Sequence, residues 1–295
     1  MSPIILYFAS GDSLYPGAAL LFAAVVVLPY FRRGWLRLLG RVVAWAGLVM
    51  MVMASPPFCW WVDAGFGSAF LWWVIAEHRS YPGRQVSRQA ISALVLVSLV
   101  ALAMRELSYR RMSRFTGAPS DHLTVIGDSI SAGTGDRVPT WPALMQLKTG
   151  VAVRNLSRAG AGVFDVRSMA AQITPEDTLI LIELGGNDML AGVPASRFAH
   201  GLEALLSNLC TPQRTVVMFE LPLLPHWVEY GQIQRRLAIR HRVLLIPKHY
   251  FTEVLAGAGA TSDGVHLSAV GAEHMVSVVT QLLSPTLTPS MPSTR

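Results

Sequence analysis

The chain has 295 residues, of which 52% are hydrophobic and only 14% are charged, and its mean hydropathy is +0.42. This composition is too apolar for an ordinary soluble domain, so part of the chain is expected to lie in lipid. The net charge of +6 does not indicate nucleic-acid binding, because the excess is confined to the apolar half: 11 Lys and Arg stand against 4 Asp and Glu before Ser120, and 13 against 14 from there on.

Three apolar runs in the first half approach the roughly 20 residues that a bilayer-crossing helix needs. They cover Pro16–Phe31, Val42–Val62 and Gln89–Met104. The first run has no basic residue before it and further apolar runs after it, so we expect it to be retained rather than cleaved as a signal peptide. A fourth segment, Phe58–Ala76, contains Asp63 and four tryptophans, which suits an interfacial helix as well as a span. Residues 1–115 are therefore predicted to form an all-α transmembrane region of three or four helices.

The number of spans decides on which side of the membrane the second half lies. If the early cluster Arg32, Arg33, Arg37 and Arg41 is cytoplasmic, three spans add Arg105, Arg110, Arg111 and Arg114 to the cytoplasmic side, whereas four spans add Arg79, Arg84 and Arg88. The two arrangements differ by one arginine. The apolar runs predict a multi-pass protein of the cell membrane, and arginine counting leaves the side of its second half open.

From Asp121 onward, short strand-like apolar runs alternate with helical ones, which predicts a parallel α/β sheet. The five expected strands are Leu123–Gly127, Val151–Asn155, Thr178–Leu184, Thr215–Leu221 and Val243–Ile246. The expected helices are Thr140–Leu147, Phe164–Ile173, Pro194–Leu209, Gly231–His241 and Ser268–Leu283. Residues 121–284 are long enough for one domain with its own core, and the Pro/Ser/Thr-rich residues 285–295 are predicted to be a disordered tail.

The motif Gly127-Asp128-Ser129-Ile130-Ser131 directly follows the first expected strand. Ser129 would then lie at the carboxyl end of that strand and at the start of a helix, where ligands bind in open parallel sheets and where free N–H groups favour a developing negative charge. Taken alone, this tripeptide is weak evidence, and a turn with an N-cap serine explains it better.

A second motif, Asp263-Gly264-Val265-His266, is expected in a loop after the fifth strand. An aspartate three residues before a histidine can hold the imidazole Nδ1, which leaves Nε2 free to accept a proton from a serine. Oxyanion donors could come from two further glycine-containing blocks, Asn155-Leu-Ser-Arg-Ala-Gly160 and Gly185-Gly186-Asn187-Asp188, through the Gly160 backbone N–H and the Asn187 amide.

These four blocks, in this order, resemble the SGNH/GDSL hydrolase superfamily, especially its bacterial acyl-CoA thioesterase I/lysophospholipase-like and arylesterase-like members. The resemblance covers about Leu123 to Leu283 and includes Trp141-Pro142. It implies a three-layer, flavodoxin-like fold and metal-independent hydrolysis of an ester or thioester through an acyl-enzyme. It also implies a catalytic triad of Ser129, Asp263 and His266 and an oxyanion hole formed by Ser129, Gly160 and Asn187. The apolar first half departs from the family's usual pattern, and the habits of the family favour an extracytoplasmic catalytic domain.

No cofactor or metal is expected, because the sequence lacks a G-x-x-x-x-G-K-[ST] loop and any zinc-like spacing of His and Cys. Cys59 and Cys210 are expected to be small buried hydrophobic residues. The apolar loop Leu221–Trp227 could line an acyl pocket or pack against protein or bilayer. The expected partners are an acyl ester or thioester substrate, possibly from a lipid or envelope glycan, and the lipid bilayer. Two alternatives stay open: an envelope O-acyltransferase with the same triad, and a non-catalytic membrane-anchored binding protein.

Overall fold

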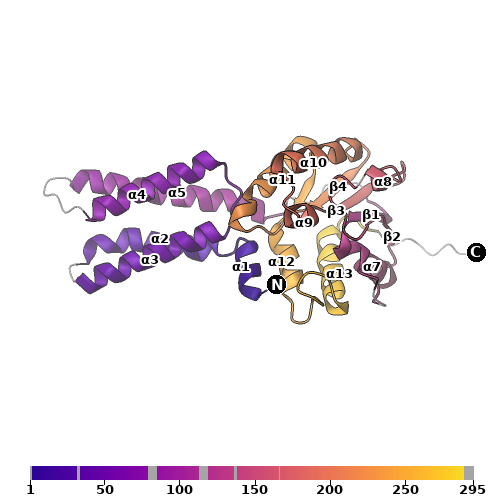
Figure 1. Cartoon of the computed structure of the whole chain (residues 1–295), viewed down its shortest axis with the longest axis horizontal. Coiled ribbons are helices and arrows are strands. Elements are labelled where there is room, and N and C mark those ends of the chain that lie inside the picture. Colours follow the sequence, from indigo (N-terminus) through magenta and orange to yellow (C-terminus); the bar gives the residue numbers. More distant parts are fainter. Residues whose placement is uncertain are drawn as a thin grey trace, which may run out of the picture. The chain divides into compact units, whose positions relative to one another are not determined.

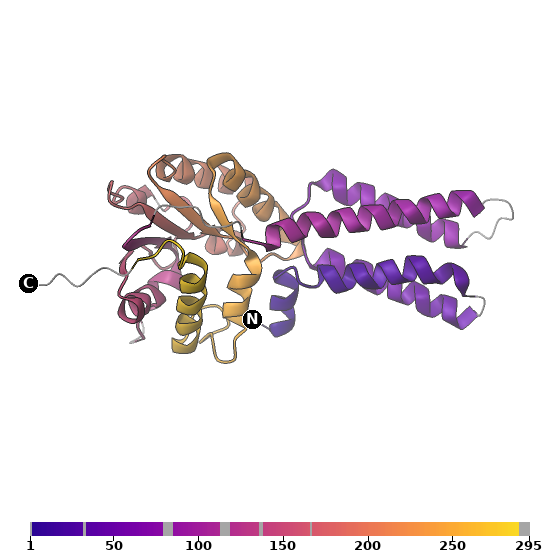
Figure 2. The same cartoon turned by 180° about the vertical axis from the view of Figure 1, so that it is seen from behind.

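A computed structural model describes residues 2–31, 34–78, 85–112, 119–135, 138–165 and 167–288. The chain folds into two compact units, both visible in Figures 1 and 2. The first, which we call the α/β unit, comprises Met1–Leu6, Met112–Pro222 and Glu229–Arg295. The second, which we call the helical unit, comprises Tyr7–Arg111 and Leu223–Val228.

The α/β unit is built on a sheet of five parallel strands in the order β2-β1-β3-β4-β5. The strands are β1 (His122–Gly127), β2 (Ala152–Asn155), β3 (Leu179–Glu183), β4 (Thr215–Phe219) and β5 (Leu244–Ile246). The central strands β1, β3 and β4 are buried almost throughout, as continuous apolar runs require when helices cover both faces. The chain leaves β1 for β2 on one side and then crosses to β3 on the other, so ligands are expected at the carboxyl end of β1. The predicted flavodoxin-like parallel sheet is confirmed.

Helices cover both faces of this sheet and make three layers, as Figure 1 shows. One face packs against α7 (Trp141–Thr149), α12 (Lys248–Ala256) and α13 (Ala269–Leu283) in a shared hydrophobic cluster. The other face is covered by α10 (Ala195–Leu209) and α11 (Val228–His241). In α10 the leucines and Phe198 recur at helical spacing and are buried, which is why this stretch forms an amphipathic helix.

Two predicted features of the α/β unit are corrected. The helix expected at Phe164–Ile173 is reduced to α8 (Arg167–Ala170), because carboxylates of Asp165 and Asp188 accept the N–H groups of Gly162 and Val163 and hold a turn there. The tail expected from residue 285 begins later, because Leu287 pairs with Ser120 and Thr286 is buried. Residues 289–295 lie outside the described part of the chain.

The helical unit contains α2 (Leu14–Val27), the 3-10 turn η1 (Leu28–Tyr30), α3 (Gly34–Met53), α4 (Trp60–His78) and α5 (Gln85–Arg110). The apolar run Val42–Val62 was predicted as one helix, but α3 ends at Met53 and α4 begins at Trp60. Pro56 and Pro57 explain the break, since neither can donate a helical backbone hydrogen bond and Ser55 before them adopts a left-handed conformation (φ 49°).

Close backbone contact joins α2 to α3 in the helical unit. A Cβ atom on Gly17 would lie 2.8 Å from the carbonyl oxygen of Gly47, and one on Gly47 would lie 2.6 Å from that of Gly17. Small residues that let two backbones approach are typical of helix pairs in membranes, where apolar side chains gain nothing by leaving lipid. The helices α4 and α5 form a second pair, and α2 also packs on α5.

The helical unit is apolar both inside and outside. Its interior is a cluster that includes Leu21, Phe70 and Leu99, while Leu38, Trp72 and Val97 are examples of large apolar side chains that point outward and are more than half exposed. By length and composition, two helices of the described part of the chain could cross a membrane: α3 and the Ser87–Arg110 part of α5. A third candidate is the pair α1 (Pro3–Ala9) and Leu14–Tyr30, which is bent by 75°. The segment α4, which the sequence left ambiguous, does not meet this measure.

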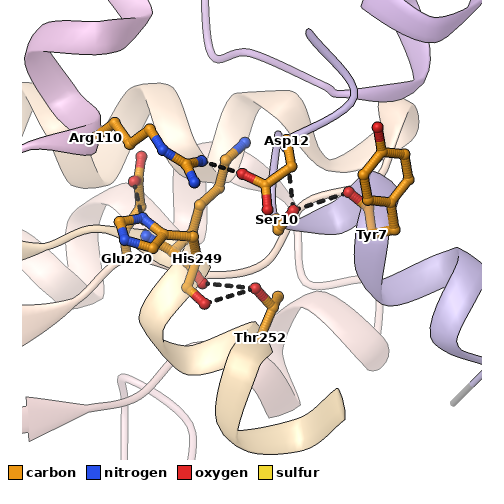
Figure 3. A network of polar contacts seen from close by, with 8 residues as sticks. Tyr7, Ser10, Asp12, Arg110, Glu220, His249 and Thr252 are labelled. Atoms are coloured by element: carbon orange, nitrogen blue, oxygen red, sulfur yellow. Dashed lines mark hydrogen bonds and ion pairs between the residues drawn. The ribbon is translucent and has the colours of Figure 1, made fainter. Parts of the chain in front are cut away.

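Polar contacts of Ser10 and Asp12 hold the bend between α1 and α2 (Figure 3). The hydroxyl of Ser10 donates to the carbonyl of Tyr7 (2.8 Å) and accepts from the backbone N–H of Asp12 (3.1 Å). The carboxylate of Asp12 forms an ion pair with Arg110, the last residue of α5, whose guanidinium also lies 5.6 Å from the ring centre of Tyr15. The end of α5 is therefore tied to the start of α2 within the helical unit.

Candidate active site

Ser129 occupies the position at which β1 gives way to a helix. β1 ends at Gly127, and the short helix α6 (Ser129–Ala132) begins two residues later. Asp128 caps this helix, since its Oδ1 accepts the N–H of Ile130 at 2.9 Å. Gly127 has no room for a side chain: an added Cβ would lie 2.7 Å from Ser131 Oγ and 2.9 Å from Glu183 Oε2. The glycine of the G-D-S-I-S motif thus allows the end of β1 to approach these two side chains.

The hydroxyl of Ser129 and the imidazole of His266 are in contact. His266 Nε2 lies 3.0 Å from Ser129 Oγ, although 137 positions separate the two residues in the sequence. His266 Nδ1 lies 2.6 Å from Asp263 Oδ2, and Asp263 Oδ1 accepts the backbone N–H groups of Val265 (2.9 Å) and His266 (2.8 Å). A proton on Nδ1, donated to Asp263, leaves Nε2 with a lone pair facing the serine, which is the arrangement that a general base needs.

The loop that carries Asp263 and His266 is closed by its own backbone contacts. Thr261 and Leu267 form an antiparallel bridge, and the N–H of Ser262 donates to the carbonyl of His266 (2.9 Å). The hydrogen bond from His266, together with those from the backbone N–H groups of His266 and Val265, holds the pKa of the Asp263 carboxyl far below its usual range. Asp263 is therefore ionised throughout the physiological pH range. The loop follows α12, a helix that the sequence did not predict, rather than β5 directly.

The two expected oxyanion donors lie on the loops after β2 and β3. Gly160 adopts a positive φ of 75°, which favours glycine, and Asn187 is in the short helix α9 (Gly186–Leu190). The amide Nδ2 of Asn187 donates to Asp128 Oδ2 (3.3 Å) and to the carbonyl of Ala161 (3.1 Å). Asn187 thus bridges the residue before Ser129 and the residue after Gly160. Hydrogen bonds therefore link the segments that carry the three expected oxyanion-hole residues, Ser129, Gly160 and Asn187.

The N-L-S-R-A-G block ties its loop to the nucleophile segment. Asn155 Nδ2 donates to the carbonyl of Ser131 at 2.8 Å, and the N–H of Arg158 donates to the carbonyl of Gly127 at 3.1 Å.

The loop Leu221–Trp227 was expected to line an acyl pocket or to pack against protein or bilayer. Its first residues pack against the protein. Leu221 is buried, and a Cβ added to Gly185 would touch it, while Leu223 is fully buried.

A buried acidic pair behind Ser129 was not predicted. Glu183, the last residue of β3, accepts the Ser131 hydroxyl at 2.9 Å and the Asp128 N–H at 3.4 Å through Oε2. The two carboxyls of Glu183 and Asp128 also hydrogen-bond each other. Burial raises the pKa of Glu183 well above 4.5 and raises that of Asp128 to about 6. The signal in the sequence was a glutamate that ends the otherwise apolar strand L-I-L-I-E.

The stability of Glu183→Gln, compared with that of the wild type at the same pH, is expected to increase as pH rises. Because the pKa of Glu183 is raised in the folded state above its ordinary 4.5, the folded protein holds a proton that the unfolded chain releases. The stability that this proton contributes is present below pH 4.5 and is lost as pH rises from there through the folded-state pKa. The glutamine variant does not titrate, so the difference in melting temperature, wild type minus variant, should fall steadily from about pH 4.5 to 8.

Asp177 offers a control of opposite sign. It is a buried acid just before β3, and although burial acts to raise its pKa, hydrogen bonds from Thr124 and Thr174 lower it. The stability that Asp177 contributes is present above its ordinary pKa of 3.8 and is lost as pH falls. For Asp177→Asn the difference in melting temperature should therefore rise with pH in the acid range. A pH-independent difference for Glu183→Gln would mean that Glu183 is not held protonated.

Four kinds of group meet at the carboxyl end of β1. They are a hydroxyl, a base in contact with it, an ionised carboxylate that orients the base, and N–H donors beside the hydroxyl. These are the elements of nucleophilic acyl transfer. Within the described residues, no group of three or more His, Cys, Asp or Glu side chains could hold a metal ion, and both cysteines are free.

Comparison with known proteins agrees with this chemistry. Residues 125–274, from β1 to α13, match the GDSL-like Lipase/Acylhydrolase family. Esterase TesA of Pseudomonas aeruginosa is 27% identical over 187 residues, which cover 58% of this chain and 91% of that protein. Arylesterase of Vibrio mimicus is 30% identical over 162 residues, 50% of this chain and 80% of that protein. A crystal structure of TesA superposes with a TM-score of 0.50 at 25% identity and covers 56% of this chain and 99% of that one. The chain therefore belongs to the GDSL-like lipase/acylhydrolase family and is an SGNH-type serine hydrolase that acts on ester bonds.

Proposed function

We propose that this protein is a membrane-anchored serine esterase that cleaves acyl esters or thioesters through an acyl-enzyme on Ser129. The observation that carries the proposal is the unbroken series of contacts from Asp263 through His266 to Ser129, with Asn187 and Gly160 on the adjoining loops. Relatives named as an esterase, an arylesterase and a thioesterase/lysophospholipase support this substrate class.

In the first half-reaction, Ser129 Oγ bonds to the acyl carbonyl carbon while His266 Nε2 accepts the hydroxyl proton. The carbonyl electron pair moves onto oxygen, where the N–H groups of Ser129 and Gly160 stabilise the negative charge. The Asn187 amide keeps its bond to Asp128 and exchanges the one to the Ala161 carbonyl for a bond to the same oxyanion. The ionised Asp263 stabilises the imidazolium. The intermediate then collapses: the bond to the leaving alcohol or thiol breaks, and His266 returns the proton to that group.

In the second half-reaction, water attacks the acyl-enzyme. His266 accepts a proton from water, the second tetrahedral intermediate forms in the same oxyanion hole, and Ser129 leaves with the proton returned by His266. The products are a carboxylic acid and an alcohol or thiol. No step requires a cofactor.

Turnover of a short p-nitrophenyl ester by the full-length protein in detergent tests this function. We expect steady-state hydrolysis that is lost when a fluorophosphonate has reacted with one equivalent of enzyme. A properly folded protein that neither turns over the ester nor reacts with the probe would contradict the esterase and favour a non-catalytic binding protein.

The same triad would serve an acyltransferase if a sugar hydroxyl replaced water in the second half-reaction. Product analysis with and without a glycan acceptor separates the two activities. The esterase predicts free acid as the main product in both cases, whereas an O-acyltransferase predicts acylated glycan whenever the acceptor is present.

We further propose that the helical unit is a multi-pass membrane anchor with four spans. The outward-facing apolar side chains of all four helices support this, because such a surface is favourable in lipid and costly in water. Although α4 falls short by composition, its 19 residues correspond to about 28 Å of helix, close to the roughly 30 Å of a hydrocarbon core. Trp60 and Trp61 at its start are exposed, as at the interfacial end of a span.

Antiparallel packing of the four helices supports a proposal for the side of the membrane on which the α/β unit lies. Because α2 pairs with α3 and α4 pairs with α5, the starts of α3 and α5 lie at the same end of the helical unit (Figure 2). The arginines nearest that end in the sequence are Arg32, Arg33, Arg37, Arg41, Arg79, Arg84 and Arg88, against Arg105, Arg110, Arg111 and Arg114 at the other. The positive-inside rule makes the richer end cytoplasmic, so the α/β unit, which follows α5, is proposed to be extracytoplasmic.

Protease treatment of spheroplasts that produce the protein with a C-terminal epitope tests the orientation. We expect the epitope to be lost from intact spheroplasts, while an epitope on the loop between α2 and α3 should survive until the membrane is permeabilised. Protection of both epitopes would reject the four-span arrangement in favour of an odd number of spans, and protection of the C-terminal epitope alone would contradict the proposed extracytoplasmic orientation.

A further inference from the structure

The carboxyl pair behind Ser129 contains a proton whose position can be deduced from its neighbours. The indole N–H of Trp141 donates to Ser131 Oγ at 3.1 Å, so the single hydrogen of Ser131 is free to point to Glu183 Oε2, 2.9 Å away. The N–H of Asp128 is shared between the backbone carbonyl of Glu183 (3.2 Å) and Oε2 (3.4 Å). Because Oε2 accepts two hydrogen bonds, it acts as the carbonyl oxygen of the acid, which leaves Oε1 to carry the proton.

The acceptor for that proton is the Asp128 carboxylate. Two buried carboxyls can hydrogen-bond only if one of them is protonated, and Glu183, fully enclosed at the end of β3, is the one whose charged form is the more strongly disfavoured. Asp128 meanwhile accepts N–H groups from Ile130 and Asn187, which suits an ionised carboxylate. The pair therefore consists of a neutral Glu183 that donates and an anionic Asp128 that accepts.

This arrangement connects the interior of the sheet to the oxyanion hole. Asp128 Oδ1 fixes the start of α6, the helix that begins with Ser129, while Oδ2 holds the amide of Asn187. Without the Glu183 carboxyl as a donor, the Asp128 carboxylate would lose one of the contacts that fix its rotation. The Asn187 amide would then be bound to a less firmly held partner. An oxyanion-hole donor contributes to the rate only when it is already aimed at the developing charge.

We propose that Glu183 is a positioning residue of the esterase: as a neutral carboxylic acid it orients Asp128, which in turn aims the Asn187 amide at the oxyanion. This inference rests on the proposed catalytic function of Ser129 and Asn187. Glu183 itself does not contact the reacting atoms. The property that matters is a hydrogen-bond donor at Oε1 together with an acceptor at Oε2, and not negative charge.

Glu183→Gln and Glu183→Leu separate these properties. The glutamine amide supplies both a donor and an acceptor in the same shape, so its kcat should stay within about threefold of the wild type. Leucine supplies neither, so kcat should fall roughly tenfold to a hundredfold with KM changed less than about twofold, since removing an oxyanion donor outright costs about 100- to 1,000-fold. Asp177→Asn, which alters a buried acid at the opposite end of β3, should leave kcat unchanged at 25 °C even if it lowers the melting temperature.

Wild-type kcat in folded Glu183→Leu, or an equal loss of kcat in the glutamine and leucine variants, would overturn the proposal. Should the leucine variant fail to fold, Asp128→Asn tests the second step of the proposal, from Asp128 to Asn187. Its amide cannot accept from both Ile130 and Asn187, so kcat should fall at least tenfold, and an unchanged kcat would again overturn the link. Reaction of the wild type with a fluorophosphonate is measured alongside. A reactive wild type with unaffected variants refutes only the role of Glu183, whereas an inert wild type refutes the esterase itself.

Discussion

Replacing Ser129 with alanine is expected to reduce kcat/KM for a p-nitrophenyl ester by about 10,000-fold or more, because no other hydroxyl contacts the His266 imidazole in the described part of the chain. The fold should not change, since the hydroxyl is not part of the cap that Asp128 provides for α6. A small residual rate over water should persist, because the oxyanion-hole donors and the substrate-binding surface remain.

The matched control for this substitution is Ser168→Ala. Ser168 is also near the start of a short helix that follows the sheet edge, and its hydroxyl makes only a local contact with the carbonyl of Asp165 (3.1 Å). Activity of this control should equal that of the wild type. Retention of more than a few per cent of wild-type activity in Ser129→Ala would mean that another group forms the acyl-enzyme.

Replacing His266 with alanine is expected to cost nearly as much as replacing Ser129, and the double variant should be no slower than either single variant. The two side chains act as one unit through the 3.0 Å contact between Nε2 and Oγ, so removal of either abolishes the same step. Additive losses would indicate that His266 and Ser129 act in separate steps, which contradicts general-base catalysis by this histidine.

His241→Ala controls for the loss of a histidine paired with a carboxylate. His241 Nε2 lies 3.0 Å from Glu203 Oε1, so this pair resembles that of His266 and Asp263 in chemistry, but it joins α11 to α10 away from Ser129. Its activity should stay within about twofold of the wild type. A large loss there would show that the assay reports stability rather than catalysis.

Local sequence patterns predicted the sheet well. Each strand was expected within two residues of its observed bounds. The central strands β1, β3 and β4 are buried on both faces, and such strands read as continuous apolar runs. The parallel order then placed the ends of β1 and β3 together, so the proximity of Ser129 and Asn187 could be anticipated from the positions of their motifs alone.

Features that depend on tertiary contacts could not be predicted in this way. The turn at Gly162–Asp165 replaces a helix because the carboxylate of Asp188, from the short helix α9, accepts the Val163 N–H. The raised pKa of Glu183 depends on its burial and on the neighbouring Asp128 carboxyl, which only the fold brings together. The helix α12 was missed between β5 and the His266 loop because its short apolar stretch carries no periodic signal strong enough to separate it from the loop.

The most direct measurement of the central claim is to locate the adduct of a fluorophosphonate on the intact protein by mass spectrometry. The probe loses fluoride to the nucleophile, so we expect one adduct per chain, on Ser129, formed rapidly in the wild type and in His241→Ala and very slowly in His266→Ala. An adduct on another residue, or equally fast labelling of Ser129 in the absence of the His266 imidazole, would contradict the proposed active site.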